Sequence, residues 1–126
     1  MTQKRSILLV DDDAGIRESM QAILTLQGYQ VDLASSGYEA LELCAGRDYD
    51  LVLLDILMPG MDGIETLRRI MEQRPDARVI MITGMEGGAE TQRAMEEGAE
   101  ALFRKPLDVA TFLPVLLPAE DLDEDY

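Results

Sequence analysis

Five short apolar runs, separated by stretches with helical spacing, constrain the fold of this chain more than any other feature. The clear runs are 6–10, 51–54, 79–82 and 101–103, and a weaker one over 30–34 also contains Gln30 and Asp32. Continuous apolar runs of this length are typical of strands that are buried on both faces. Because strands that alternate with helices form right-handed crossovers, the pattern predicts an α/β fold: a doubly wound, five-stranded parallel sheet with helices on both faces.

The stretches between the runs carry helix signals. Apolar residues recur at helical spacing from Ile16 to Leu24, and Gly28 is the expected end of that helix. Two capping-box patterns, which begin at Ser36 and Asp62, open the next two helices. The sequence therefore places a helix after each of the first three strands.

The last third of the chain is less regular. A fourth helix is expected over 89–97, and a fifth would begin near Asp108. Pro114 falls at the seventh position of that fifth helix, where a proline removes a hydrogen bond and costs about 3 kcal/mol. The last helix is therefore expected to be short or irregular. We expect one domain over 1–117, followed at 118–126 by an acidic tail that is a solvated end, the start of a linker or a docking segment.

Composition excludes several functions. The 126 residues include 11 Lys and Arg, 25 Asp and Glu, a single Cys and no His, so the formal net charge is −14. This charge repels phosphate backbones, so direct binding to nucleic acid or to an anionic membrane is not expected. Neither a His-based nucleophile relay nor a disulfide within the chain can form. No apolar run is long enough to span a bilayer, and the start does not resemble a signal peptide, so we expect a cytoplasmic protein.

Polar residues lie within three positions of the end of four of the apolar runs. They are Asp11, Asp12 and Asp13 after the first run, Asp55 after the third, Thr83 after the fourth and Lys105 after the fifth. The carboxyl ends of parallel strands meet at one edge of a sheet, where such acids would repel one another. Asp13 is the expected N-cap of the first helix. Oxygen ligands without His or Cys favour Mg²⁺, with Mn²⁺ as a substitute, and this ion commonly shares phosphate oxygens. The pattern therefore predicts a phosphoryl-handling site.

The motifs that contain these residues resemble the receiver domain of two-component response regulators. They are Val10-Asp-Asp12, Leu54-Asp-Ile-Leu-Met-Pro-Gly-Met-Asp-Gly63, Ile82-Thr-Gly84 and Lys105-Pro106. The resemblance covers about residues 6–113, and the central stretch is its most specific part. It implies a flavodoxin-like, chemotaxis-regulator-like fold with strand order 2-1-3-4-5.

The resemblance also implies a role for each site residue. Asp55 matches the phosphoacceptor, which takes its phosphoryl group from the phosphohistidine of a sensor histidine kinase or a phosphotransfer protein. Asp12 matches the direct metal ligand, Asp11 the ligand that acts largely through water, and Leu57 the residue whose backbone carbonyl binds the metal. Thr83 and Lys105 match the hydroxyl and the amine that contact the phosphoryl group, and Gly84 matches the small residue that gives this group room.

Departures from the family pattern qualify the expected output. The family's switch aromatic falls on Leu102, while Phe103 is expected on the opposite face of its strand. We therefore expect the surface of the fourth helix, fifth strand and fifth helix to signal through Leu102 packing, a backbone shift or altered dynamics. Residues 115–117 either cover the sheet or form a contact with a partner or a second copy. Apolar Leu57 and Met85 flank the path of a hydrolytic water, which predicts slow loss of the phosphoryl group.

Two other functions compete with a phosphorylated signalling module. One is an Mg²⁺-dependent phosphatase with an Asp nucleophile, but that chemistry usually needs a second acid at the position of Leu57. The other is a receiver fold that binds partners independently of phosphorylation, against which the complete acidic pocket argues. A regulatory phosphoacceptor that acts on an unknown downstream effector, and is not itself an enzyme, is therefore the leading expectation.

Overall fold

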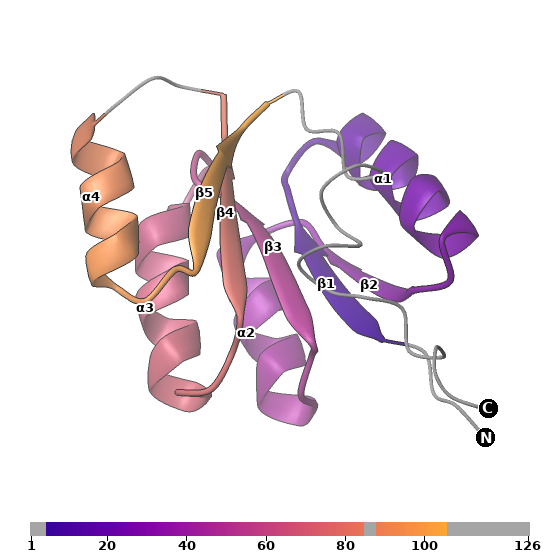
Figure 1. The fold of residues 1–126 in the computed structure, drawn as a ribbon, viewed down its shortest axis with the longest axis horizontal. Coiled ribbons are helices and arrows are strands. Elements are labelled where there is room, and N and C mark those ends of the chain that lie inside the picture. Colours follow the sequence, from indigo (N-terminus) through magenta and orange to yellow (C-terminus); the bar gives the residue numbers. More distant parts are fainter. Residues whose placement is uncertain (1–4, 85–87, 106–126) are drawn as a thin grey trace, which may run out of the picture.

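Figure 1 shows the computed structural model, which describes residues 5–84 and 88–105. Its strands are β1 (Ser6–Val10), β2 (Gln30–Ala34), β3 (Leu51–Asp55), β4 (Val79–Thr83) and β5 (Ala101–Arg104). Its helices are α1 (Ala14–Leu26), α2 (Gly37–Gly46), α3 (Gly63–Gln73) and α4 (Gly88–Glu96). The strands form one parallel sheet in the order β2-β1-β3-β4-β5. The predicted fold class and strand order are therefore confirmed.

The register of the sheet aligns the carboxyl ends of its central strands. Val10 of β1 lies opposite Leu54 of β3, and Asp55 lies opposite Ile82 of β4. β3 and β4 each run one residue further than the apolar pattern predicted, because Asp55 and Thr83 pair in the ladder. The residues that follow these strands therefore share one edge of the sheet.

The core is divided between the two faces of the sheet by strict alternation along the strands. On the face that α2, α3 and α4 cover, residues such as Val10, Leu54 and Met81 are buried. On the face that α1 covers, their neighbours, such as Leu9 and Leu53, are buried. β5 follows the same rule, with Leu102 packed on the first core and Phe103 on the second. The expectation that Phe103 faces away from Leu102 is therefore confirmed.

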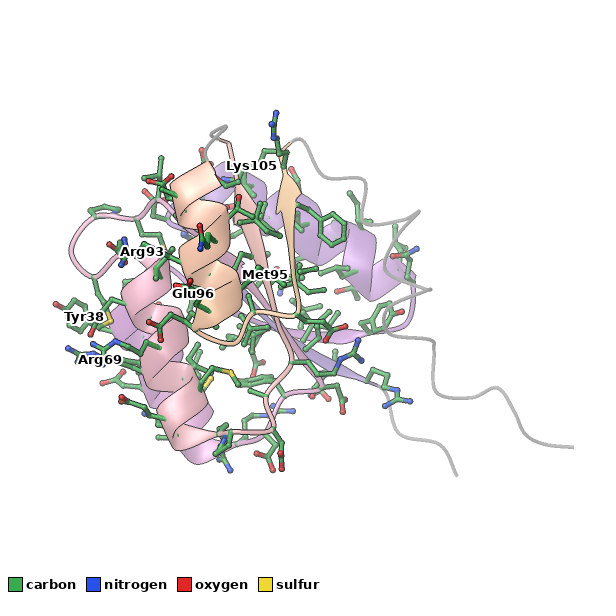
Figure 2. All side chains as sticks on the ribbon, turned by 60° about the vertical axis from the view of Figure 1, so that its left-hand side comes forward. Tyr38, Arg69, Arg93, Met95, Glu96 and Lys105 are labelled. Carbon is green, nitrogen blue, oxygen red and sulfur yellow. The ribbon has the colours of Figure 1, made fainter. Side chains whose placement is uncertain are left out.

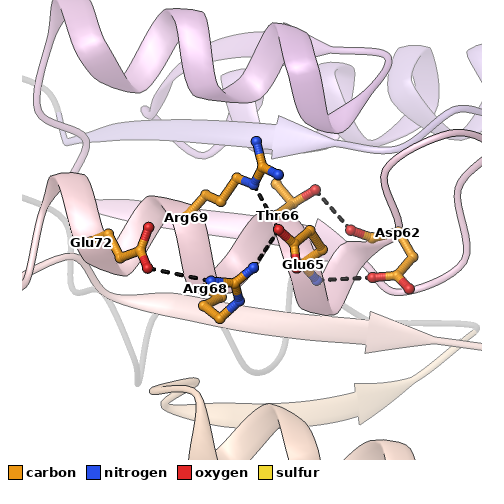
Figure 3. A network of polar contacts seen from close by, with 6 residues as sticks. All are labelled: Asp62, Glu65, Thr66, Arg68, Arg69 and Glu72. Atoms are coloured by element: carbon orange, nitrogen blue, oxygen red, sulfur yellow. Dashed lines mark hydrogen bonds and ion pairs between the residues drawn. The ribbon is translucent and has the colours of Figure 1, made fainter.

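The helices α1, α2 and α3 begin where a side chain accepts a hydrogen bond from a backbone N–H of the first turn. Asp13, Ser36 and Asp62 each accept a hydrogen bond from the N–H three residues on, as N-caps do. In a capping box, the glutamate three residues after the N-cap also accepts a hydrogen bond from the N-cap backbone N–H. In α3 the Glu65 carboxylate instead binds Arg68 and Arg69 (Figure 3). The capping pattern thus predicted where the helix starts but not which partner its glutamate has.

Several predictions concern residues outside the described ranges. These are the short last helix, Met85, residues 115–117 and the division between 1–117 and 118–126. They remain predictions. Among the residues that the structure describes, no helix is both long enough and apolar enough to cross a membrane.

Candidate functional site

Three carboxylates meet at the carboxyl edge of the central strands. Asp11 and Asp12 follow β1, and Asp55 ends the neighbouring strand β3. One oxygen from each of the three lies within 4.8 Å of the others. Asp11 and Asp55 are buried, with exposed fractions of 3% and 5%, whereas Asp12 is exposed. The cluster therefore has a desolvated inner pair and a third carboxylate that opens to solvent.

Lys105 places a positive charge against the inner pair. Its Nζ lies 3.1 Å from Oδ2 of Asp11 and 3.3 Å from Oδ2 of Asp55. Its backbone N–H donates to the Thr83 carbonyl at 2.7 Å, which fixes the end of β5 beside β4. The amine therefore reaches across the edge of the sheet and partly neutralises two carboxylates that would otherwise repel each other.

The electrostatics of the site follow from this packing. Burial, followed by the charge of Asp11, raises the pKa of Asp55, while Lys105 and a hydrogen bond from the Leu57 backbone oppose the rise. Burial also acts against the charge on Lys105, but its hydrogen bond to Asp11 and the charge of Asp55 outweigh this and raise the pKa of the amine. The site thus holds an excess of negative charge, which a further cation would relieve.

Thr83 and Gly84 stand at the same edge. Thr83 is buried at the end of β4, next to the strand that carries Asp55. Gly84 is exposed, and a Cβ on it would meet no heavy atom within 4 Å among the described residues. The structure therefore places the predicted hydroxyl and the predicted small residue at the edge that carries the acids.

Leu57 contributes to the site through its backbone. Its N–H supports the Asp55 carboxylate, while its side chain is 53% exposed. The loop that follows returns the chain to β3, where Gly63 donates its N–H to the Ile56 carbonyl at 2.7 Å. A Cβ on Gly63 would lie 2.2 Å from the Asp55 carbonyl oxygen. Glycine is therefore required where α3 begins beneath the predicted phosphoacceptor.

Two contacts at the acid cluster were missed by the sequence reasoning. The Asp13 N–H donates to Oδ1 of Asp11 at 3.0 Å, and Nη1 of Arg17 donates to the Asp11 carbonyl oxygen at 2.7 Å. The only sequence signal for the second contact is a basic residue in the first turn of a helix, where positive charge is unfavourable.

The sheet order, the two helical layers and the acidic edge define a doubly wound α/β protein of the chemotaxis-regulator type. The description of the family whose profile matches residues 7–116 is "response regulator receiver domain". The chain belongs to this family.

Individual relatives agree with this assignment. The chain is similar to the response regulator MprA of Mycobacterium sp. (strain KMS), with 36% identity over 107 residues, which are 85% of this chain and 46% of the relative. It therefore spans about half the length of the curated relatives it matches. A CheY-like receiver domain protein from Methanospirillum hungatei JF-1 has 32% identity and a TM-score of 0.86, with 90% of this chain and 91% of that chain covered.

A third relative was solved as a complex. CheY in the CheX-CheY-BeF3-Mg²⁺ complex from Borrelia burgdorferi is 36% identical, with a TM-score of 0.82 and coverage of 89% of this chain and 86% of that one. The likeness extends over nearly the whole of both chains. It concerns the receiver itself, and not the further length of the curated relatives.

Proposed function

We propose that this chain is the phosphoacceptor domain of a two-component system and that Asp55 receives the phosphoryl group. The observation that carries the proposal is the ammonium of Lys105, held 3.1 and 3.3 Å from the buried carboxylates of Asp11 and Asp55. A structural ion pair would need only one of these acids. Two buried acids, an exposed third and one amine at a sheet edge instead suit a site that takes up a cation and a phosphoryl group.

The residues present fit a divalent cation. Asp11, Asp12 and Asp55 offer hard oxygen ligands within 4.8 Å of one another, and the chain contains no His that would favour a softer metal. With the Leu57 backbone carbonyl, they would hold Mg²⁺, or Mn²⁺ in its place. When bound, the ion supplies positive charge to the phosphoryl oxygens and to the acid cluster.

Asp55, Lys105 and Thr83 then have distinct roles in phosphoryl transfer. An oxygen of Asp55 attacks the phosphorus of a phosphohistidine on the partner kinase or phosphotransfer protein. The O–P bond forms as the P–N bond breaks, and the electron pair of that bond leaves with the partner's imidazole. Lys105 neutralises phosphoryl oxygen charge, and the Thr83 hydroxyl donates a hydrogen bond to it. Such a transfer depends on charge stabilisation more than on covalent help from the protein.

The acyl phosphate would act as a signal through the neighbouring elements. A new demand for hydrogen-bond donors at Asp55 draws Thr83 inward, and the chain continues from Thr83, the last residue of β4, to α4. On α4, Met95 is 46% exposed and lies near Arg93 and Glu96 (Figure 2). We infer that α4 and β5 contribute to the surface that an effector or a second copy reads; the fifth helix predicted for this surface lies outside the described residues.

Phosphorylation in vitro tests the proposal directly. Incubation of the chain with acetyl phosphate and Mg²⁺, followed by intact-mass measurement, should give a species heavier by one phosphoryl group. The species should be absent without Mg²⁺ and in Asp55→Asn. Absence of the species in the wild type, or its persistence in Asp55→Asn, would overturn the assignment. Catalytic turnover of phosphomonoesters would instead support the phosphatase, although Leu57 stands where that enzyme needs an acid.

A further inference from the structure

We propose that Arg17 is a positioning residue of the cation site, which holds the backbone that carries Asp11 and Asp12. The proposal rests on the proposed function, since it concerns the same site. Arg17 lies in the first turn of α1 and is half-buried. Its Nη1 donates to the Asp11 carbonyl oxygen at 2.7 Å, and its own N–H donates to the Asp13 carbonyl at 3.0 Å.

Arg17 differs from most arginines of the chain in its choice of partner. Six of them form ion pairs with surface carboxylates: Arg5, Arg47, Arg68, Arg69, Arg74 and Arg78. Within residues 5–84 and 88–105, Arg17 pairs with no carboxylate, although Asp11, Asp12 and Asp13 are close in sequence. Its guanidinium binds a backbone oxygen of the first acid instead. A cation at the amino end of a helix is unfavourable, so its position there requires another reason.

The contact completes a set of restraints on one residue. The Asp11 N–H donates to Ala34 of β2 at 3.1 Å, and its Oδ1 accepts from the Asp13 N–H at 3.0 Å. Its Oδ2 accepts from Lys105, and its carbonyl accepts from Arg17. Every oxygen of Asp11 therefore has a donor. Consecutive acids repel one another, and these restraints keep the Asp11 carboxylate at the cation site, and hold the backbone that leads into Asp12, before a cation arrives.

A positioning role and a purely electrostatic role of Arg17 predict opposite changes in Mg²⁺ binding when its side chain is removed. As a positive charge near the cluster, it would oppose a second cation, so its removal would tighten Mg²⁺ binding. As a positioning residue it fixes the ligands, so its removal weakens binding. Loss of outer-shell partners of metal ligands typically reduces metal affinity by about 10–100-fold. The sign of the change therefore separates the two roles.

The test is Mg²⁺ titration of the 126-residue chain by calorimetry, in the wild type, Arg17→Ala, Arg17→Lys and Arg78→Ala. Arg78→Ala is the matched control, because it removes the same charge and breaks the ion pair with Glu100 at the opposite edge of the sheet. We expect Arg17→Ala to weaken Mg²⁺ binding about 10-fold or more, with partial recovery in Arg17→Lys and no change in Arg78→Ala. Unchanged or tighter binding in Arg17→Ala overturns the proposal.

A second readout separates positioning from general damage. The Mg²⁺ concentration that gives half-maximal phosphorylation by acetyl phosphate should rise in Arg17→Ala, while the rate at saturating Mg²⁺ should stay within about twofold of wild type. An equal fall of the rate at all Mg²⁺ concentrations contradicts the assigned role. If Arg17→Ala does not fold, the same two measurements are made on Arg17→Lys. Wild-type Mg²⁺ affinity in Arg17→Lys then overturns the proposal that the guanidinium positions the site. Failure of the wild type to bind Mg²⁺ would instead refute the proposed function.

Discussion

At the scale of single residues, the site is defined by opposite charges that lie close together and are largely buried. Lys105 partly neutralises Asp11 and Asp55, both of which are more than 90% buried. One ammonium cannot neutralise two carboxylates and an exposed third, so the site keeps an excess of negative charge that a cation would relieve. The three acids and Lys105 could be predicted from the sequence because each lies at, or within two residues of, the end of a recognisable strand.

Other contacts of the site could not be predicted in this way. The hydrogen bond from Arg17 to the Asp11 carbonyl depends on how α1 leaves the sheet, and apolar spacing does not define that direction. The alternation rule, in contrast, placed Leu102 and Phe103 on opposite faces, because the side chains of a strand have a period of two.

Leu57 provides a prediction about the lifetime of the acyl phosphate. Its side chain is 53% exposed two residues after Asp55, where a polar group could orient the water that hydrolyses the phosphoryl group. Leu57→Glu should speed the loss of the phosphoryl group by at least about 10-fold, below the usual contribution of a well-placed general base. The measurement is the decay of the phosphorylated mass after removal of acetyl phosphate in the presence of Mg²⁺.

The matched control for that experiment is Leu26→Glu, which adds the same charge to a side chain that is 88% exposed at the end of α1. It should leave the decay unchanged. A wild-type half-life of seconds at room temperature would contradict the view that Leu57 slows hydrolysis.

At the scale of elements, the strands were easier to predict than the helix partners. The central strands β1, β3 and β4 were clear because both of their faces are buried, so both sets of side chains are largely apolar, whereas the edge strand β2 carries Gln30 and Asp32 and gave a weaker signal. The helix starts followed from their N-caps. The ion pairs of α3 did not, because Arg68 and Glu72 are exposed, Glu65 is half-buried and several pairings on one helix have similar energies (Figure 3).

The junction between β3 and α3 gives a prediction about stability. A Cβ on Gly63 would lie 2.2 Å from the Asp55 carbonyl oxygen and 2.6 Å from Cα of Ile56. Both neighbours are backbone atoms and cannot rotate away, so Gly63→Ala should lower the free energy of unfolding by about 3 kcal/mol. Urea unfolding followed by circular dichroism measures the change.

Gly46→Ala is the control, because a Cβ on this last residue of α2 meets no heavy atom within 4 Å among the described residues. It should leave stability unchanged or raise it by up to about 1 kcal/mol, since alanine restricts the unfolded chain. Equal stability of the two variants would show that α3 can move away from β3 at little cost.

At the scale of the whole molecule, the net charge of −14 has two separable consequences. Repulsion spread over the surface opposes the compact state, and any salt screens it. Repulsion within the cluster of Asp11, Asp12 and Asp55 is local, and two of the three acids are buried, so a bound divalent cation would relieve it far better than diffuse ions do. The fold could be predicted as a whole because the strand order follows the family. Which acids belong to the cluster and which to the surface became clear only from the positions of the carboxylates in the structure.

Thermal unfolding can separate the two consequences. At a Mg²⁺ concentration of about ten times its Kd, binding to the folded state adds about 1.4 kcal/mol, which corresponds to a rise in Tm of roughly 5 °C for a domain of this size. NaCl at the same ionic strength should raise Tm less, because it only screens the surface. The difference between the two salts should disappear in Asp55→Asn, which removes a ligand, and persist in Glu96→Gln, which removes the same charge from exposed α4 (Figure 2). Equal shifts by both salts in the wild type would mean that the acid cluster contributes to the charge of the surface without binding the cation.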